Sequence, residues 1–152
     1  MTETMRGPRE VMADLLHSSV DGEWDKFVEL YTDDAVIEMP FAPPGVPRVS
    51  DGAALRTRIL GMAQNRPWTF QRAENVVLHE TTDPEVVVFE YELHGTVTAT
   101  TEPLALSFIM VVTVRDGKIV HSRDYANPLA TAKLLDRLPE LVEAYRNEGA
   151  QA

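Results

Sequence analysis

The chain contains no cysteine, so neither a disulfide framework nor a thiolate metal site is available to it. It also has no apolar run near the roughly 18 residues that a bilayer-spanning helix needs. Its first residues, MTETMRGPRE, mix charges early and lack the apolar segment of a signal peptide. From these three absences we expect a soluble protein of a reducing compartment, with a cytoplasmic location and no membrane partner.

Positive charge is also scarce. The chain carries 14 Lys and Arg against 24 Asp and Glu, which gives a formal net charge of −10. Because nucleic-acid-binding proteins concentrate Lys and Arg on one face, this balance argues against a nucleic-acid partner. The acidic residues are spread over 23–34, 83–92 and 136–148, which is typical of a solvated exterior rather than an acidic tail.

What is present is an ordinary globular composition. Hydrophobic residues make up 44% of the 152 residues, which is enough to bury a core without disulfide bonds. We therefore expect a single domain over 1–152.

Hydrophobic periodicity divides the chain into a helical first part and a strand-rich second part. Helical spacing and capping signals predict helices over 9–20, 24–31 and about 51–63, and near the end over 129–138 and onward to about 147. A short strand over 35–39 and a proline-rich irregular segment over 41–47 come before the third helix. Period-two alternation predicts strands over 68–79, 85–100, 104–115 and 118–125, joined by short turns.

This order of elements predicts an α+β fold. We expect a cone-shaped domain in which N-terminal helices pack on a strongly curved, mostly antiparallel sheet, followed by a C-terminal helix. Such a sheet leaves a pocket at the open end of the cone.

The last predicted strand carries the most informative residue, Asp124. The turn signal Asp116-Gly117 joins two strongly patterned strands, and aspartate is a poor strand former. We interpret Asp124 as a carboxyl that points into an apolar cavity, where lost hydration raises its pKa toward neutrality and suits it to proton transfer. The alternative is a rim carboxylate that pairs with an arginine or caps the helix after Pro128.

Three segments resemble the nuclear-transport-factor-two-like superfamily, and the resemblance covers nearly the whole chain. They are WDKFVELYTDDAVIEMP (24–40), FEYELHG (89–95) and DGKIVHSRDYANP (116–128). The superfamily includes ketosteroid isomerase, SnoaL-type polyketide cyclases, limonene-epoxide hydrolase and the phenazine-biosynthesis A/B proteins. In the phenazine proteins an acid/base glutamate, and in limonene-epoxide hydrolase a catalytic aspartate, occupies the place that matches Asp124.

The departures from the superfamily are also informative. Met39 stands where ketosteroid isomerase has an aspartate base, and Ile109 or Met110 stands where it has an acidic oxyanion donor. Steroid isomerase chemistry is therefore not implied. Tyr91 and Leu93 align with the Arg-x-Asp pair of limonene-epoxide hydrolase, which puts that water-activating triad in doubt.

Two further residues are candidates for acid–base work. His94 shares a strand face with two glutamates, where it either shuttles a proton or is a surface or dimer-interface histidine. Glu38 precedes Met39-Pro40 and either divides acid and base roles with Asp124 or is a solvated strand-end glutamate. The remaining histidines show no ligand spacing, so we expect no metal site.

Aromatic side chains and methionines either fill the core or line the cavity, and their abundance implies an apolar, ring-containing ligand. Tyr31 and Tyr91 also offer a hydrogen bond to an oxyanion. The candidate substrate contacts are Tyr31, Met39, Phe41, Met62, Trp68, Phe70, Phe108 and Met110. Asn127 is a further candidate, although it also suits the turn into the last helix.

The resemblance implies a cofactor-free enzyme closest to the SnoaL-like and phenazine A/B-like branch. Such an enzyme acts on a small hydrophobic, carbonyl-bearing intermediate of secondary metabolism by cyclisation, isomerisation, dehydration or condensation, with Asp124 as general acid/base. Two alternatives stay open: epoxide opening, and non-catalytic binding of a small molecule or a partner enzyme. Because many members of the superfamily pair through the outer sheet face, a homodimer is expected.

Overall fold

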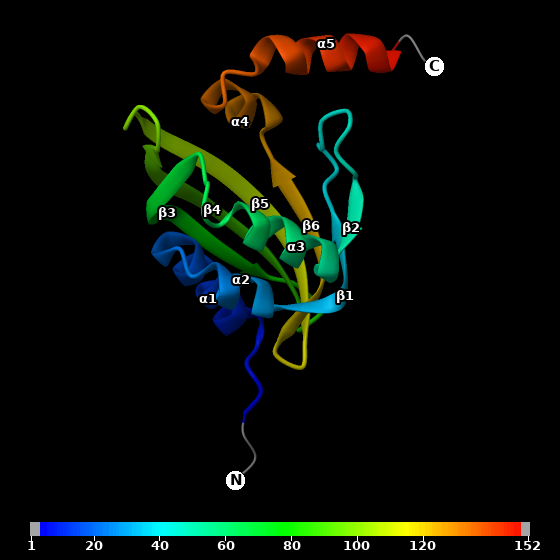
Figure 1. Ribbon diagram of the computed structural model, residues 1–152. Coiled ribbons are helices and arrows are strands. Elements are labelled where there is room, and N and C mark those ends of the chain that lie inside the picture. Colours follow the sequence, from blue (N-terminus) through cyan, green and yellow to red (C-terminus); the bar gives the residue numbers. More distant parts are fainter. Residues whose placement is uncertain (1–3, 150–152) are drawn as a thin grey trace.

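A strongly curved six-stranded sheet wraps around three N-terminal helices in this computed structural model (Figure 1). The structure describes residues 4–149, so the ends of the expected domain, 1–3 and 150–152, lie outside the described residues. The helices are α1 (Pro8–Asp21), α2 (Trp24–Glu29), α3 (Gly52–Met62), α4 (Pro128–Leu134) and α5 (Leu138–Gly149). The strands are β1 (Tyr31–Glu38), β2 (Val49–Asp51), β3 (Trp68–Glu80), β4 (Val86–Val97), β5 (Pro103–Arg115) and β6 (Lys118–Ala126).

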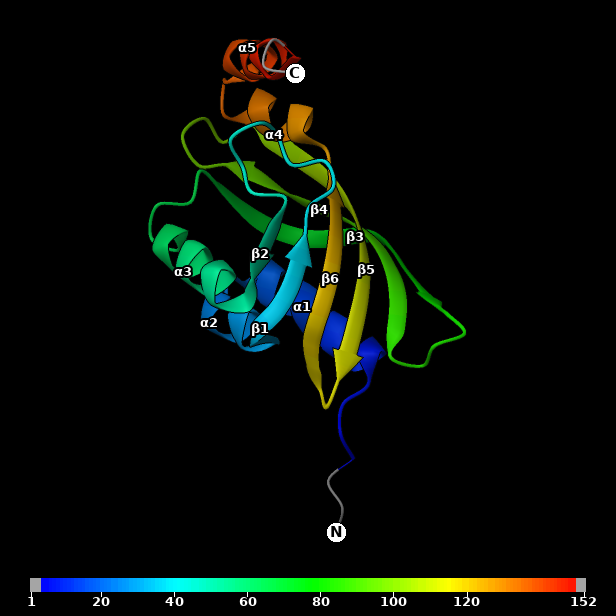
Figure 2. The same cartoon turned by 90° about the vertical axis from the view of Figure 1, so that its right-hand side faces the viewer.

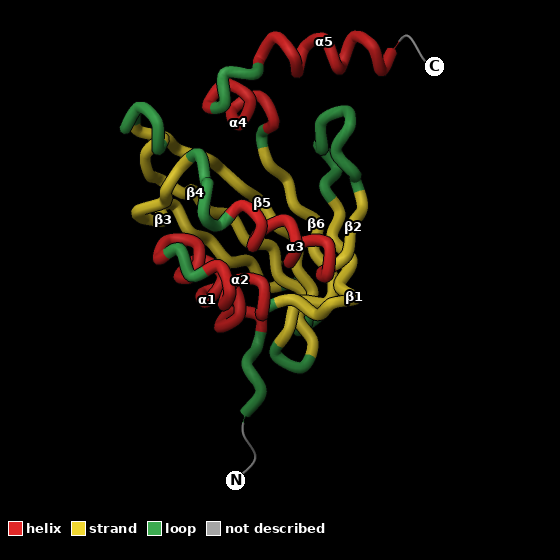
Figure 3. Tube along the Cα trace, viewed as in Figure 1, coloured by secondary structure: helices red, strands yellow, loops and turns green. Residues whose placement is uncertain are grey.

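The strand order in the sheet is β2-β1-β6-β5-β4-β3. Every neighbouring pair is antiparallel except β1 and β6, which run parallel. Figure 3 shows the helices α1, α2 and α3 on one side of this sheet. The predicted α+β cone with a mostly antiparallel sheet and a C-terminal helix is confirmed.

The region around β1 differs from the sequence-based expectation. The predicted helix over 24–31 ends at Glu29, and Tyr31 already begins β1. The acidic stretch 32–34 lies inside this strand, between Tyr31 and Val36, which both pair with β6 and between which the register shifts. The strand β2 was not expected, since its three residues are too few to show a periodicity.

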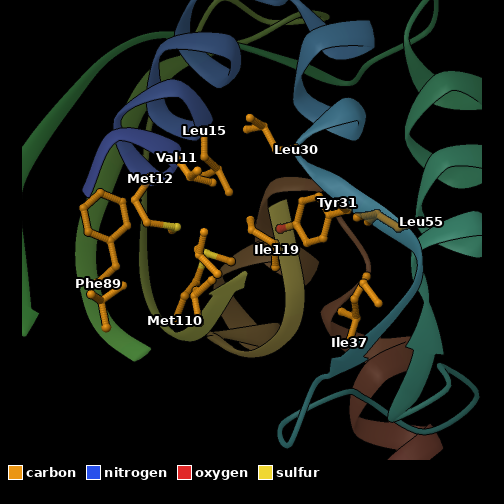
Figure 4. Packing of buried hydrophobic residues seen from close by; sticks show 14 of the residues in the cluster. Val11, Met12, Leu15, Leu30, Tyr31, Ile37, Leu55, Phe89, Met110 and Ile119 are labelled. Carbon is orange, nitrogen blue, oxygen red and sulfur yellow. The ribbon is translucent and has the colours of Figure 1, made fainter. Parts of the chain in front are cut away.

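Alternation along β4 divides the sheet into an inner and an outer face. Val87, Phe89, Tyr91 and Leu93 are buried, whereas the residues between them are partly exposed. We call the buried side, which faces the helices, the inner face, and the opposite side the outer face. On the inner face, side chains from α1 such as Met12 and Leu15 pack against the sheet (Figure 4).

The two C-terminal helices lie beyond the end of the sheet where β6 finishes (Figure 2). Asn127 caps α4 by accepting a hydrogen bond from the backbone N–H of Leu129 at 3.0 Å. None of the residues of α5 is buried. No helix within residues 4–149 is both long enough and apolar enough to cross a bilayer.

Candidate functional site

The candidate site is centred on Asp124, which lies on the inner face near the end of β6. Asp124 pairs with Met110 on β5, and Met110 pairs with Phe89 on β4, so the three side chains form a row across the sheet. Met110 and Phe89 are both buried, and so is Ser122, two residues before Asp124. The sequence therefore places a carboxyl at one end of an apolar row.

The environment of Asp124 is unfavourable to a negative charge. The residue as a whole stays partly accessible, but its Oδ1 atom is enclosed and has no hydrogen-bond partner within residues 4–149. Burial raises the pKa of Asp124 from 3.8 to about 6. The Ser122 hydroxyl and the charges of Arg58 and His121 act in the opposite direction on this pKa and do not cancel the effect of burial.

The Ser122 hydroxyl is itself enclosed and makes no hydrogen bond of normal geometry within the described residues, so it lies near the carboxyl without fixing it. Arg58 belongs to α3, one turn after the buried Leu55. Sequence reasoning missed both residues. Alternation from Asp124 would have found Ser122, and helical spacing from Leu55 would have found Arg58.

Two buried tyrosines share the environment of Asp124. Burial, followed by the charge of Asp124, raises the pKa values of Tyr31 and Tyr91 well above the usual value of a phenol. Both side chains are therefore neutral hydrogen-bond donors across the physiological range. The Tyr91 hydroxyl donates to Met110 Sδ at 3.4 Å, and Figure 4 shows Tyr31 among the core residues near Ile119. A titratable carboxyl and two neutral phenols thus come from β6, β1 and β4.

Glu38, predicted as a second carboxylate, does not join Asp124. It lies on the outer face, where Glu38 Oε2 is 2.7 Å from His121 Nε2 and 3.4 Å from Arg123 Nε. The His121 hydrogen bond is the main reason that the pKa of Glu38 lies below its usual value. The parallel register, in which Glu38 pairs with Arg123, puts both on the face that alternation turns away from Asp124.

His94 also lies on the outer face. Its Nε2 atom is 3.0 Å from Glu92 Oε2 and 3.4 Å from Glu74 Oε2. Of the four residues predicted to be catalytic, the structure therefore brings Asp124 and Tyr91 together and places Glu38 and His94 elsewhere. Among residues 4–149, the group of side chains with the spacing of metal ligands is Glu74, Glu92 and His94, which does not include Asp124.

The predicted substrate contacts are divided between several places. Tyr31, Met110 and the partly buried Phe108 and Phe70 belong to the core or pack against it. Trp68 contacts Phe70, with ring centroids 6.4 Å apart. Met62 is exposed at the end of α3, and Met39 is half-buried after β1. Phe41 and Asn127 line a hollow on the other side of the sheet, and Phe108 and the catalytic candidate Tyr91 also contribute to its lining.

This hollow has a volume of about 550 Å³ and lies on the outer face, next to the start of α4. Phe41 and Tyr125 form one wall and meet edge to face at 5.4 Å between ring centroids. Glu90, Glu92 and Asn75 supply polar groups on another side. Local sequence patterns do not predict this hollow, because its walls come from a loop and four strands that only the folded sheet brings together.

Comparison with known proteins identifies relatives over most of the chain. The model of the SnoaL-like domain family matches residues 12–122. The uncharacterized protein YesE of Bacillus subtilis is 31% identical over 121 residues, which cover 79% of this chain and 81% of YesE. The uncharacterized PhzA/B-like protein PA3332 of Pseudomonas aeruginosa is 30% identical over 122 residues, covering 80% of this chain and 84% of that protein.

A solved structure agrees with these relatives. A Bacillus subtilis protein with a provisional isomerase assignment superposes with a TM-score of 0.76 at 27% identity, covering 85% of this chain and 92% of the other. The family model matches most of the chain, and the curved sheet packed against helices agrees with it. This chain therefore belongs to the SnoaL-like domain family of the nuclear-transport-factor-two-like superfamily.

Proposed function

We propose that the protein is a cofactor-free acid/base enzyme that acts on a small hydrophobic, carbonyl-bearing intermediate of secondary metabolism, with Asp124 as the proton-transfer group. The observation that carries the proposal is the state of this carboxyl. Its Oδ1 atom is enclosed without a partner within residues 4–149, and its pKa is about 6. A general acid/base works best when its pKa lies near the working pH.

The proposed reaction begins with the Asp124 carboxylate removing a proton from the carbon beside a carbonyl. The C–H electron pair forms the carbon–carbon double bond of an enolate, the π pair of the carbonyl moves to its oxygen, and the proton moves to Asp124. Tyr91 or Tyr31, which are neutral donors, stabilise the resulting enolate oxygen by a hydrogen bond. In a conjugated enolate, return of the proton from Asp124 to another carbon gives isomerisation. Attack of the enolate carbon on a second carbonyl forms a carbon–carbon bond and an alkoxide, and the alkoxide takes the proton from Asp124, which gives cyclisation or condensation.

The neighbouring chemistries fit this site less well. Opening an epoxide with water, as in the limonene-epoxide hydrolases, uses an Arg-x-Asp pair on the second long strand. Here those positions are Tyr91 and Leu93, both buried on the inner face. The apolar surroundings and phenolic donors thus support proton transfer to and from carbon more than activation of water.

The test uses 2-tetralone, a bicyclic ketone with acidic protons beside its carbonyl. We expect the protein to catalyse exchange of these protons for deuterium in D₂O, followed by ¹H NMR. Asp124→Asn keeps the shape of the side chain but removes the titrating proton, so the exchange rate is expected to fall by about 10²-fold or more. Asp34→Asn, the same change at an exposed position of β1, serves as the matched control and retains the rate.

Equal exchange by the wild type and Asp124→Asn would remove Asp124 from the mechanism. Hydrolysis of styrene oxide with incorporation of ¹⁸O from water would support epoxide opening instead. Binding of 2-tetralone without exchange or any product would support a protein that only holds its ligand.

A further inference from the structure

We propose that Glu74, Glu92 and His94 form a binding site for a divalent transition metal, with Zn²⁺ as the probe that tests it. The three residues lie on the outer face of the sheet, on β3 and β4. The site is separate from Asp124 and does not depend on the acid/base function proposed above.

The distances within this group are close to those around a tetrahedral metal ion. His94 Nε2 lies 3.0 Å from Glu92 Oε2 and 3.4 Å from Glu74 Oε2. All three ligand atoms lie within 4.8 Å of one another. Zinc bonds to nitrogen and oxygen are about 2.0–2.2 Å long, so two ligand atoms of a tetrahedral site are separated by roughly 3.3–3.6 Å. The side chains therefore approach the required arrangement without movement of the backbone.

Irregularities in the backbone of β3 help to place Glu74 opposite Glu92. The register shifts between Phe70 and Arg72 and again between Glu74 and Val77, so two irregularities flank the short segment 72–74. Between them, Glu74 pairs directly with Glu92 on β4. Like charges placed directly opposite on neighbouring strands destabilise a sheet unless a cation lies between them.

In this structure Arg72 supplies part of the positive charge beside these carboxylates. Its guanidinium forms an ion pair with Glu74, and its Nη2 atom lies 3.3 Å from His94 Nδ1. The Arg72 side chain is 57% exposed, so it is free to move away. The His94 side chain is only 18% exposed, so its ring is held in place. Arg72 and a metal ion thus compete for the same carboxylate.

The set of ligands indicates which metals are suitable. An imidazole nitrogen with two carboxylate oxygens suits zinc and similar transition metals, whereas calcium and magnesium prefer oxygen ligands alone. Three protein ligands also leave a fourth position for water or another small ligand. Glu92 lines the outer-face hollow as well, so a metal bound to it would lie at the edge of that hollow.

The experiment is a titration of the chelator-treated full-length protein with Zn²⁺, followed by calorimetry and by competition with a chromogenic chelator. We expect one equivalent of Zn²⁺ to bind, and His94→Ala and the nearly isosteric Glu92→Gln each to weaken binding by about tenfold or more. Arg72→Ala removes the competing cation and is expected to tighten it.

His79→Ala is the matched control, because His79 contacts a single carboxylate, Glu90, across the same two strands. It should leave zinc affinity unchanged, and circular dichroism should show that every variant is folded. The proposal is overturned by the absence of Zn²⁺ binding at about 100 µM or by equal affinity in wild type, His94→Ala and Glu92→Gln. Equal affinity in the three proteins would mean that Zn²⁺ binds elsewhere and that His94 forms ion pairs only.

Discussion

At the scale of single residues, the face of the sheet decides how each carboxyl titrates. Asp124 on the inner face has a raised pKa because burial removes water from it. Glu38 on the outer face has a lowered pKa because His121 donates a hydrogen bond to it. The two groups come from adjacent strands and shift in opposite directions, so of this pair only Asp124 titrates near neutral pH.

The raised pKa of Asp124 has a consequence for stability. The folded protein holds this proton more tightly than the unfolded chain does. Ionisation of Asp124 therefore leaves the free energy of unfolding unchanged at low pH and lowers it most above pH 6. A rise of the pKa from 3.8 to about 6 corresponds to about 3 kcal/mol.

Asp124→Asn removes this pH-dependent cost. We expect the free energy of unfolding of the variant, relative to wild type, to increase by about 2 kcal/mol between pH 4 and pH 7.5. Urea unfolding at both pH values measures it, and the comparison between them cancels any constant effect of burying an amide. A difference that stays the same at the two pH values would show that the pKa of Asp124 is ordinary.

At the scale of elements, the close contact of β3 and β4 depends on Gly95. A Cβ atom at this position would lie 1.9 Å from the carbonyl oxygen of Thr69. The adjacent register shift between Phe70 and Arg72 and the packing of His94 against Glu74 both lie beside this contact. A glycine is required there because the two backbones leave no room for a side chain.

Gly95→Ala is therefore expected to lower the free energy of unfolding by about 1–3 kcal/mol, the usual cost of forcing atoms into a filled space. Gly61→Ala in α3 is the matched control, because nothing lies within 4 Å of its added Cβ. Since alanine favours a helix over glycine, the control should be neutral or more stable by up to about 1 kcal/mol. Equal stability of the two variants, measured by urea unfolding, would contradict the close approach of the strands.

At the scale of the whole molecule, much of the architecture could be predicted from the sequence. Period-two alternation in 85–125 was strong enough to predict the three-strand run of β4, β5 and β6 with their turns and their inner and outer faces. The start of α3 is also encoded locally, since the Asp51 side chain accepts a hydrogen bond from the backbone N–H of Ala54 at 2.8 Å. These features are local, so neighbouring residues encode them.

Other features depend on contacts between distant parts of the chain. The parallel pairing of β1 with β6 places Tyr31 in a strand and puts Glu38 on the outer face, and local periodicity carries no information about it. The meeting of Asp124, Tyr31 and Tyr91 likewise requires the curvature of the complete sheet. Sequence alone assigned Asp124 a face but could not select which side chains surround it.

The enclosure of the Asp124 carboxyl within this curved sheet is tested most directly by NMR. The side-chain carboxyl carbon of Asp124 can be titrated in ¹³C-aspartate-labelled protein and assigned by its loss in Asp124→Asn. A midpoint at about pH 6 is the result expected from the pKa of the buried group. A midpoint near 3.8, the ordinary value for aspartate, would show that the carboxyl is solvated and would contradict its proposed role in proton transfer.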